Sequence, residues 1–128
     1  MTFRGSLTFT IPLNPVTKKN SQQIVYNAKT KRPFITQSKR YKDYEKDVKN
    51  HIKGQGLCIS EPVEVTAVFY RATRHNVDLT NLMEALHDVL VKYDVLADDG
   101  WKIIRSVDGS RVEFDKDNPR TEVTIRRI

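Results

Sequence analysis

The chain has 128 residues with 22 Lys or Arg, 16 Asp or Glu and a net charge of +6, a length that fits one domain. Its hydrophobic content of 38% and charged content of 30% are typical of a globular protein and exclude a disordered chain. No apolar run reaches about 18 residues and no secretory signal opens the chain, so we expect a cytoplasmic protein without a membrane span. Cys58 is the only cysteine, so we expect no internal disulfide and no cysteine-based zinc cluster, and we interpret Cys58 as a small apolar filler.

The first half of the chain predicts a strand, a hairpin and a helix. Alternating apolar residues indicate a strand over residues 5–11, and a polar loop with two lysines follows. Residues 23–28 and 32–36 flank a short basic turn, which is typical of a hairpin. From Ser38, a plausible N-cap, apolar residues recur at spacings of 3, 4 and 4, which predicts a helix of about 15 residues that stops at Gly54.

The second half predicts a central strand, a helix and short strands. Residues 63–70 are partly apolar on both faces, as in a central strand. Asp78 is a good N-cap for an amphipathic helix that ends near Tyr93. Three strand-like segments follow, at residues 101–107, 110–114 and 121–128. The expected fold is a two-layer α+β single domain over residues 1–128, with a mixed, mostly antiparallel sheet and two main helices.

Basic and acidic residues are unevenly distributed along the chain. Residues 1–53 hold twelve Lys or Arg against three acids. A nucleic acid is the commonest partner of such a surface, and a solvated basic face is the alternative. Residues 75–101 hold six of the sixteen acids against one basic residue, Lys92. An acidic segment in a basic chain suggests divalent cations held against a phosphate-rich partner.

The acidic side chains of residues 75–101 fall at positions where they can converge. On the predicted helix, Asn81, Glu84 and Asp88 are spaced i, i+3 and i+7 and share one face. Asp78 begins this helix, and the pair at residues 98–99 lies in the loop after it. If the fold brings these ends together, oxygen ligands favour Mg²⁺ or Mn²⁺. Each acid also has a plainer interpretation, as a helix cap, a solvated surface charge or a turn residue. His75 and His87 are expected to be surface or packing residues instead of ligands.

The motif at residues 74–82, R-H-N-V-D-L-T-N-L, resembles that of RusA-type Holliday junction resolvases, which are encoded mainly by phages and prophages. The family motif is close to D-L-D-N-L-x-K, followed by a helix ending in D-x-L and then by a D-D pair. Residues 88–90 match the second element and residues 98–99 the third. Residues 12–20 look like the family's N-terminal loop, so the resemblance extends over about residues 6–127.

The resemblance implies a small homodimeric, Mg²⁺-dependent endonuclease that nicks four-way DNA junctions symmetrically. Asp78 and Asp99 match two of the family's three catalytic carboxylates, and Asp98 lies beside them as a further metal ligand. Two positions depart from the motif. Thr80 replaces its second aspartate and Glu84 replaces its lysine. Because residues i and i+4 share a helix face, Glu84 is expected to supply the missing oxygen ligand.

The remaining functional residues would bind or support the DNA substrate. Phosphate contacts are expected from basic and amide side chains of the N-terminal half and the motif: Lys18, Lys19, Asn20, Lys39, Arg40, Lys42 and Arg74. Supporting roles are expected for Asn81, Asp88 and Thr80. A dimer with two-fold symmetry would match the approximate symmetry of a four-way junction.

Two other functions stay open at this point. Thr80 and Glu84 are also compatible with a protein of the same fold that binds branched DNA without cleaving it. The third possibility is a basic RNA-binding accessory protein in which the acids are caps and surface charges.

Overall fold

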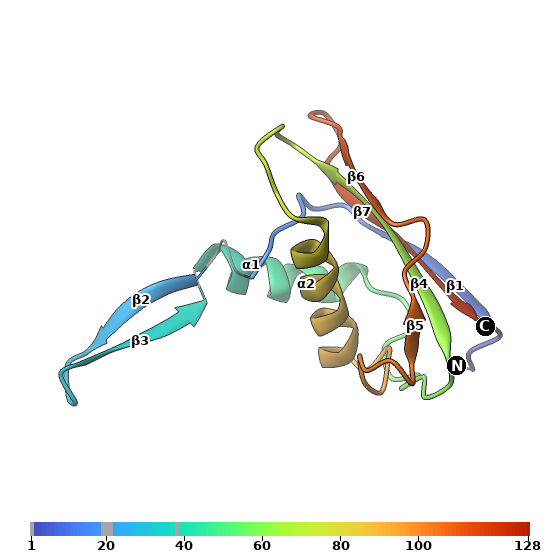
Figure 1. The fold of residues 1–128 in the computed structure, drawn as a ribbon, viewed down its shortest axis with the longest axis horizontal. Coiled ribbons are helices and arrows are strands. Elements are labelled where there is room, and N and C mark those ends of the chain that lie inside the picture. The colour runs from blue at the N-terminus through green and yellow to red at the C-terminus, as the bar shows by residue number, and fades with distance from the viewer. Residues whose placement is uncertain (1, 19–21, 38) are drawn as a thin grey trace.

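The computed structural model describes residues 2–18, 22–37 and 39–128, with residues 22–27 and 33–37 described by their backbone alone. Five strands form one sheet, and two helices cover one of its faces (Figure 1). The strands of this sheet are β1 (Ser6–Ile11), β4 (Val63–Arg71), β5 (Ile104–Ser106), β6 (Arg111–Phe114) and β7 (Arg120–Arg127). The predicted two-layer α+β fold with a mixed sheet is confirmed.

The spine of the sheet is formed by β1, β7 and β4 in that order. Both contacts of β7 are antiparallel, and its Val123 is opposite Phe9 of β1 on one side and Ala67 of β4 on the other. The other side of β4 pairs in parallel with two short strands, β5 near its start and β6 near its end. Every second residue of β4 from Val63 to Phe69 is buried. This strand is therefore central, as its sequence predicted.

Both helices bury an apolar face against the sheet. Helix α2 (Leu79–Lys92) follows Asp78 and buries six residues in the core, among them Leu86 and Leu90. Helix α1 (Lys39–Val48) is shorter than the expected 15 residues. The chain tightens after Val48 into a 3₁₀ turn, η2 (Lys49–His51), and becomes extended at Ile52. The predicted cap Ser38 lies outside the described residues.

The predicted hairpin is confirmed as β2 (Gln22–Asn27) and β3 (Arg32–Gln37), which pair with each other and with no other strand in the described part of the chain. Figure 1 shows this hairpin extending away from the sheet beyond the start of α1. The turn between its strands is described and exposed, and Lys31 there has a positive φ of 56°. The hairpin therefore carries a basic tip away from the core.

Two local expectations are corrected by the structure. Residues 101–103 form a turn instead of the start of a strand, because the amides of Ile103 and Ile104 both donate to the Gly100 carbonyl, at 3.0 and 2.9 Å. Cys58, expected as an apolar filler, is exposed and has a φ of 46°. Across the described ranges, no helix is long and apolar enough to cross a membrane.

Candidate functional site

A cavity of about 480 Å³ lies between α2 and the turn that joins β5 to β6. Helix α2 contributes Thr80, Glu84 and His87 to its wall, and the loop after the helix contributes Asp99. Residues 107–110 of the β5–β6 turn form the opposite wall. We call this the α2 cavity. Three of the residues expected in the site, Thr80, Glu84 and Asp99, thus share one concave surface.

The loop after α2 is directed back toward the helix by its backbone hydrogen bonds. Asp94 has a φ of 59°, which reverses the chain after the last turn of the helix. Leu96 then pairs with Ile59, and the Ala97 amide donates to the Ile59 carbonyl at 2.9 Å. This anchor comes two residues before Asp99. It explains how a carboxylate beyond the helix end returns to the helix wall.

The opposite wall of the α2 cavity is fastened to β4. Thr66 Oγ1 donates to the Asp108 carbonyl at 2.7 Å, and the Ala67 amide donates to Ser110 Oγ at 3.0 Å. The turn between β5 and β6 is therefore held in place by the central strand. Its side chains face the helix as a defined surface.

His87 is a member of the α2 cavity that the sequence had suggested was a surface or packing residue. Its Nε2 atom is buried and has no hydrogen-bond partner among the described residues. Burial lowers the pKa of His87, while Asp99 and Asp88 act in the opposite direction. Burial thus favours a neutral imidazole next to the carboxylate of Asp99.

Asp78 occupies the N-cap position of α2 without acting as a side-chain cap. Its backbone is extended, its carboxylate makes no capping hydrogen bond, and its residue is exposed. The Asn81 side chain donates to Asp78 Oδ2 at 3.3 Å. The helix therefore leaves one carboxylate at its exposed start, accompanied by the amide expected to support it.

Asp88 is engaged with Lys18. The Lys18 ammonium donates to Asp88 Oδ2 at 2.6 Å, and both side chains are about one-third exposed, at 34% and 30%. This hydrogen bond is the main cause of a raised pKa at Lys18, and Glu84 is among the more distant acids that add to it. The loop after β1 is thereby attached to the outer face of α2.

The carboxylates do not form a compact ligand cluster in this structure. Within residues 2–18, 22–37 and 39–128, no group of three His, Cys, Asp or Glu side chains is arranged to hold a metal ion. Asp78 and Asp98 lie outside the lining of the α2 cavity. The oxygen donors of Thr80, Glu84 and Asp99 are nevertheless the type that Mg²⁺ and Mn²⁺ prefer.

Four of the predicted DNA-binding residues lie at or just before the starts of the two helices. Lys39, Arg40 and Lys42 are exposed on α1, and Lys39 forms an ion pair with Asp43 at 3.6 Å. Arg40 lies close enough to Arg71, at the end of β4, to contribute to a lowered pKa there. Arg74 is exposed in the segment before α2. Lys19 and Asn20 lie outside the described residues.

Several residues of this region were not predicted from the sequence. His87, Asp108 and Ser110 line the α2 cavity, and Arg71 lies within electrostatic reach of Arg40 on α1. The sequence held two signals for them: His87 is spaced i+3 from Glu84 and i+7 from Thr80, which places it on the same helix face, and Asp108-Gly109 is typical of a turn. The placement of Asp108 and Ser110 depends on contacts with β4 that span more than 40 positions.

Comparison with known proteins identifies the family to which the chain belongs. The family model "Endodeoxyribonuclease RusA" matches residues 12–126 of the 128. A comparison with curated proteins found no match to the sequence. The match includes both helices, strands β4 to β6, β7 as far as Arg126, and every residue of the α2 cavity, whereas β1 precedes it. The chain belongs to the RusA family of endodeoxyribonucleases, the RusA-type Holliday junction resolvases.

Proposed function

We propose that this protein resolves four-way DNA junctions by metal-dependent hydrolysis of phosphodiester bonds, with Asp78, Asp98 and Asp99 as metal ligands. Membership in a family of endodeoxyribonucleases supports the substrate and the reaction. The observation that carries the proposal for this chain is that Thr80, Glu84 and Asp99 line the same cavity. Glu84 thus lies beside the threonine that replaces a family aspartate, where it can provide the missing carboxylate.

The oxygen-rich donor set fits Mg²⁺ or Mn²⁺. When bound, such an ion activates water and neutralises charge on the phosphate. The carboxylates of Asp78, Asp98 and Asp99 would hold it, and Glu84 would add negative charge from the next helical turn. His87, with its imidazole kept neutral by burial, would leave the negative charge of Asp99 available for the cation.

Binding of the DNA backbone is assigned to the basic side chains near the helix starts. Lys39, Arg40 and Lys42 are exposed on α1, and Arg74 is exposed ahead of Asp78. Each phosphate contact releases counterions, so affinity should fall steeply with salt. Lys18 would join them only if its ion pair with Asp88 opened. Lys19 and Asn20 stay predicted contacts.

The proposed active form is a homodimer with two-fold symmetry, because two identical sites are needed to cut two strands of a symmetric junction. Light scattering coupled to gel filtration tests this assembly. A mass of about twice the 14.8 kDa of one chain is expected. The cytoplasmic location expected from the sequence stays a prediction.

A second candidate function is junction binding without cleavage. It is favoured by Thr80 and by the lack of a three-ligand cluster among the described side chains. The Thr80→Asp variant distinguishes the two. If the wild type already nicks junctions, Glu84 compensates. If only Thr80→Asp nicks them, the wild type is a binding protein.

The decisive experiment incubates the pure protein with a synthetic four-way junction, with and without Mg²⁺. We expect paired nicks only with the metal. Asp78→Asn should bind the junction but cleave it at least about 100-fold more slowly than the wild type does. Asp47→Asn is the matched control, because it removes the same charge from an exposed position on α1. Preference for RNA over the junction in a competition assay, or no cleavage with Mg²⁺ or Mn²⁺, would overturn the proposal.

A further inference from the structure

A second cavity, of about 390 Å³, lies immediately ahead of α2, and the function proposed above uses only its Arg74, as a contact to the DNA backbone. It is lined by the end of β4, the segment leading to α2, and the end of β6. Arg71, Arg74, Val77 and Phe114 are its principal residues for this argument, and we call it the Phe114 pocket. Val77 directly precedes Asp78, so the pocket adjoins the proposed metal ligand at the helix start.

The Phe114 pocket presents an aromatic ring stacked with a cation. Phe114 is 40% exposed, although aromatic rings of this size are usually buried. The Arg74 guanidinium carbon lies 4.1 Å from the centre of the ring. An exposed ring beside a planar guanidinium is a surface on which nucleic-acid bases stack.

The same pocket contains a guanidinium whose hydrogen-bonding capacity is incompletely used. Arg71 Nη1 donates to the His75 carbonyl at 2.5 Å, but the buried Nε has no partner among the described residues. Burial first, and then Arg40, lower the pKa of Arg71. The one acid in the lining, Glu113, instead accepts a hydrogen bond from Arg111 at 3.0 Å. An anion entering the pocket would satisfy Arg71 and reduce the repulsion from Arg40.

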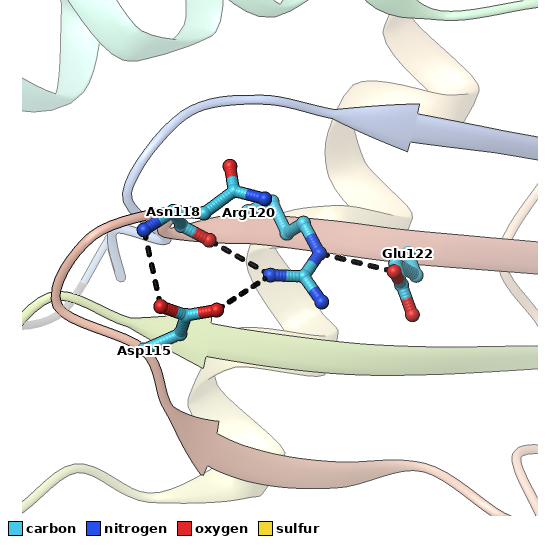
Figure 2. A network of polar contacts seen from close by, with 4 residues as sticks. All are labelled: Asp115, Asn118, Arg120 and Glu122. Atoms are coloured by element: carbon cyan, nitrogen blue, oxygen red, sulfur yellow. Dashed lines mark hydrogen bonds and ion pairs between the residues drawn. The ribbon is translucent and has the colours of Figure 1, made fainter.

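The position of Phe114 is held from both sides. Phe114 is paired with Arg71 across β6 and β4, and the Asp115 amide donates to the Arg71 carbonyl at 2.9 Å. Figure 2 shows how Arg120 fixes the loop that follows. Its Nη1 contacts Asp115 Oδ2 at 3.0 Å and the Asn118 carbonyl at 2.9 Å, while Nε contacts Glu122 at 3.0 Å.

The Arg120 guanidinium also packs 3.7 Å from the centre of the Tyr70 ring. This contact ties the loop to the penultimate residue of β4. The ring of Phe114 therefore lies on an ordered support. A preorganised support lowers the ordering cost of binding.

We infer that the Phe114 pocket binds one nucleotide of a DNA strand whose base has left the duplex stack at the branch point. The base would stack on the surface formed by Phe114 and Arg74, and its phosphate would face Arg71. The volume falls within the range of small-ligand sites, about 300–1,000 Å³. Unstacking costs least where pairing is already interrupted, so such a pocket would favour a junction over a continuous duplex.

This inference rests on the proposed function. It predicts that Phe114→Leu loses selectivity for a four-way junction over a linear duplex. Fluorescence anisotropy without divalent metal would measure affinity for a four-way junction and for a linear duplex of the same arm sequence. Loss of one base–aromatic stack should weaken junction binding about 5- to 150-fold and leave duplex binding unchanged. Leu keeps an apolar side chain at a partly exposed position, and a thermal melt confirms folding.

Phe3→Leu is the matched control, since Arg127 also packs over that ring, at 5.4 Å, near the opposite end of β7. A second series replaces each nucleotide flanking the branch point with an abasic residue. At one position the abasic residue should lower the junction affinity of the wild type but should not further lower that of Phe114→Leu. Equal abasic penalties in both proteins, or an equal loss for junction and duplex, would overturn the inference. Metal-dependent nicking by the wild type is measured separately, so failure of the pocket is distinguishable from failure of the proposed function.

Discussion

Ionisation of Tyr44 should make this protein sensitive to alkaline pH. Burial of its phenol in α1 raises the pKa of Tyr44 from 10.0 to about 12, with Thr121 acting in the opposite direction. Below pH 10 the phenol is neutral in the folded and unfolded states, so its contribution to stability is fully present. Between about pH 10 and pH 12 only the unfolded state ionises, and this contribution is lost as the pH rises.

The size of the loss follows from the shift in pKa. Two pKa units at about 1.36 kcal/mol each correspond to about 2.7 kcal/mol in full, of which about 1.4 kcal/mol is lost by pH 11. Tyr44→Phe has no phenol to ionise and should lack this part of the pH dependence. Lysine titration is common to both proteins and cancels in their difference.

Urea denaturation of the wild type and of Tyr44→Phe, at about pH 9 and about pH 11, measures the effect. The free energy of unfolding of the wild type should fall by about 1.4 kcal/mol more than that of the variant between these two pH values. A difference in unfolding free energy that stays constant within about 0.3 kcal/mol would refute the reasoning, because a folded-state pKa near 10 would then be required.

Two further predictions concern stability. A double-mutant cycle of Lys18→Met and Asp88→Asn, measured by urea denaturation, should give a coupling free energy of about 0.2–1 kcal/mol, because both side chains are partly exposed. A coupling of zero would mean that this ion pair does not stabilise the fold. Gly54→Ala should lower the free energy of unfolding by about 1–3 kcal/mol more than Gly56→Ala. Both glycines have a positive φ, at 83° and 89°, so the backbone strain is similar. A Cβ at Gly54 would lie 2.6 Å from Leu7 Cδ2, whereas one at Gly56 would meet nothing within 4 Å. Equal losses of unfolding free energy would contradict this packing argument.

The main elements were predictable because each carries its own periodicity. Alternation predicted β1 and β4, and helical spacing with Asp78 at the cap position predicted α2. The ends of elements were less accurate. Whether residues 101–103 continue a strand depends on two amides sharing the Gly100 carbonyl, a local contact that side-chain pattern does not encode.

The candidate site was predictable only where its residues lie on one helix or in the family motif. Thr80 and Glu84 share a face of α2 by spacing alone. Asp99 reaches that face because Leu96 and Ala97 pair with Ile59, almost 40 positions earlier. His87, at i+7 from Thr80, could have been assigned by the same spacing, whereas the β5–β6 turn could not. Their proximity is produced by tertiary contacts, as is the meeting of Arg71 with Phe114.

The order of strands in the sheet has a consequence for how the chain folds. β7 comes after the other strands of the sheet in chain order and lies between β1 and β4, so residues up to 119 provide β1 and β4 without the strand that joins them. Most sheet contacts therefore close long loops, which slows folding and postpones formation of the core. Until β7 is inserted, the edges of β1 and β4 that it will pair with expose unpaired backbone groups. A nascent chain should consequently acquire its fold late and nearly all at once, and substitutions that weaken β7 should reduce the yield of folded protein more than they reduce the activity of the molecules that fold.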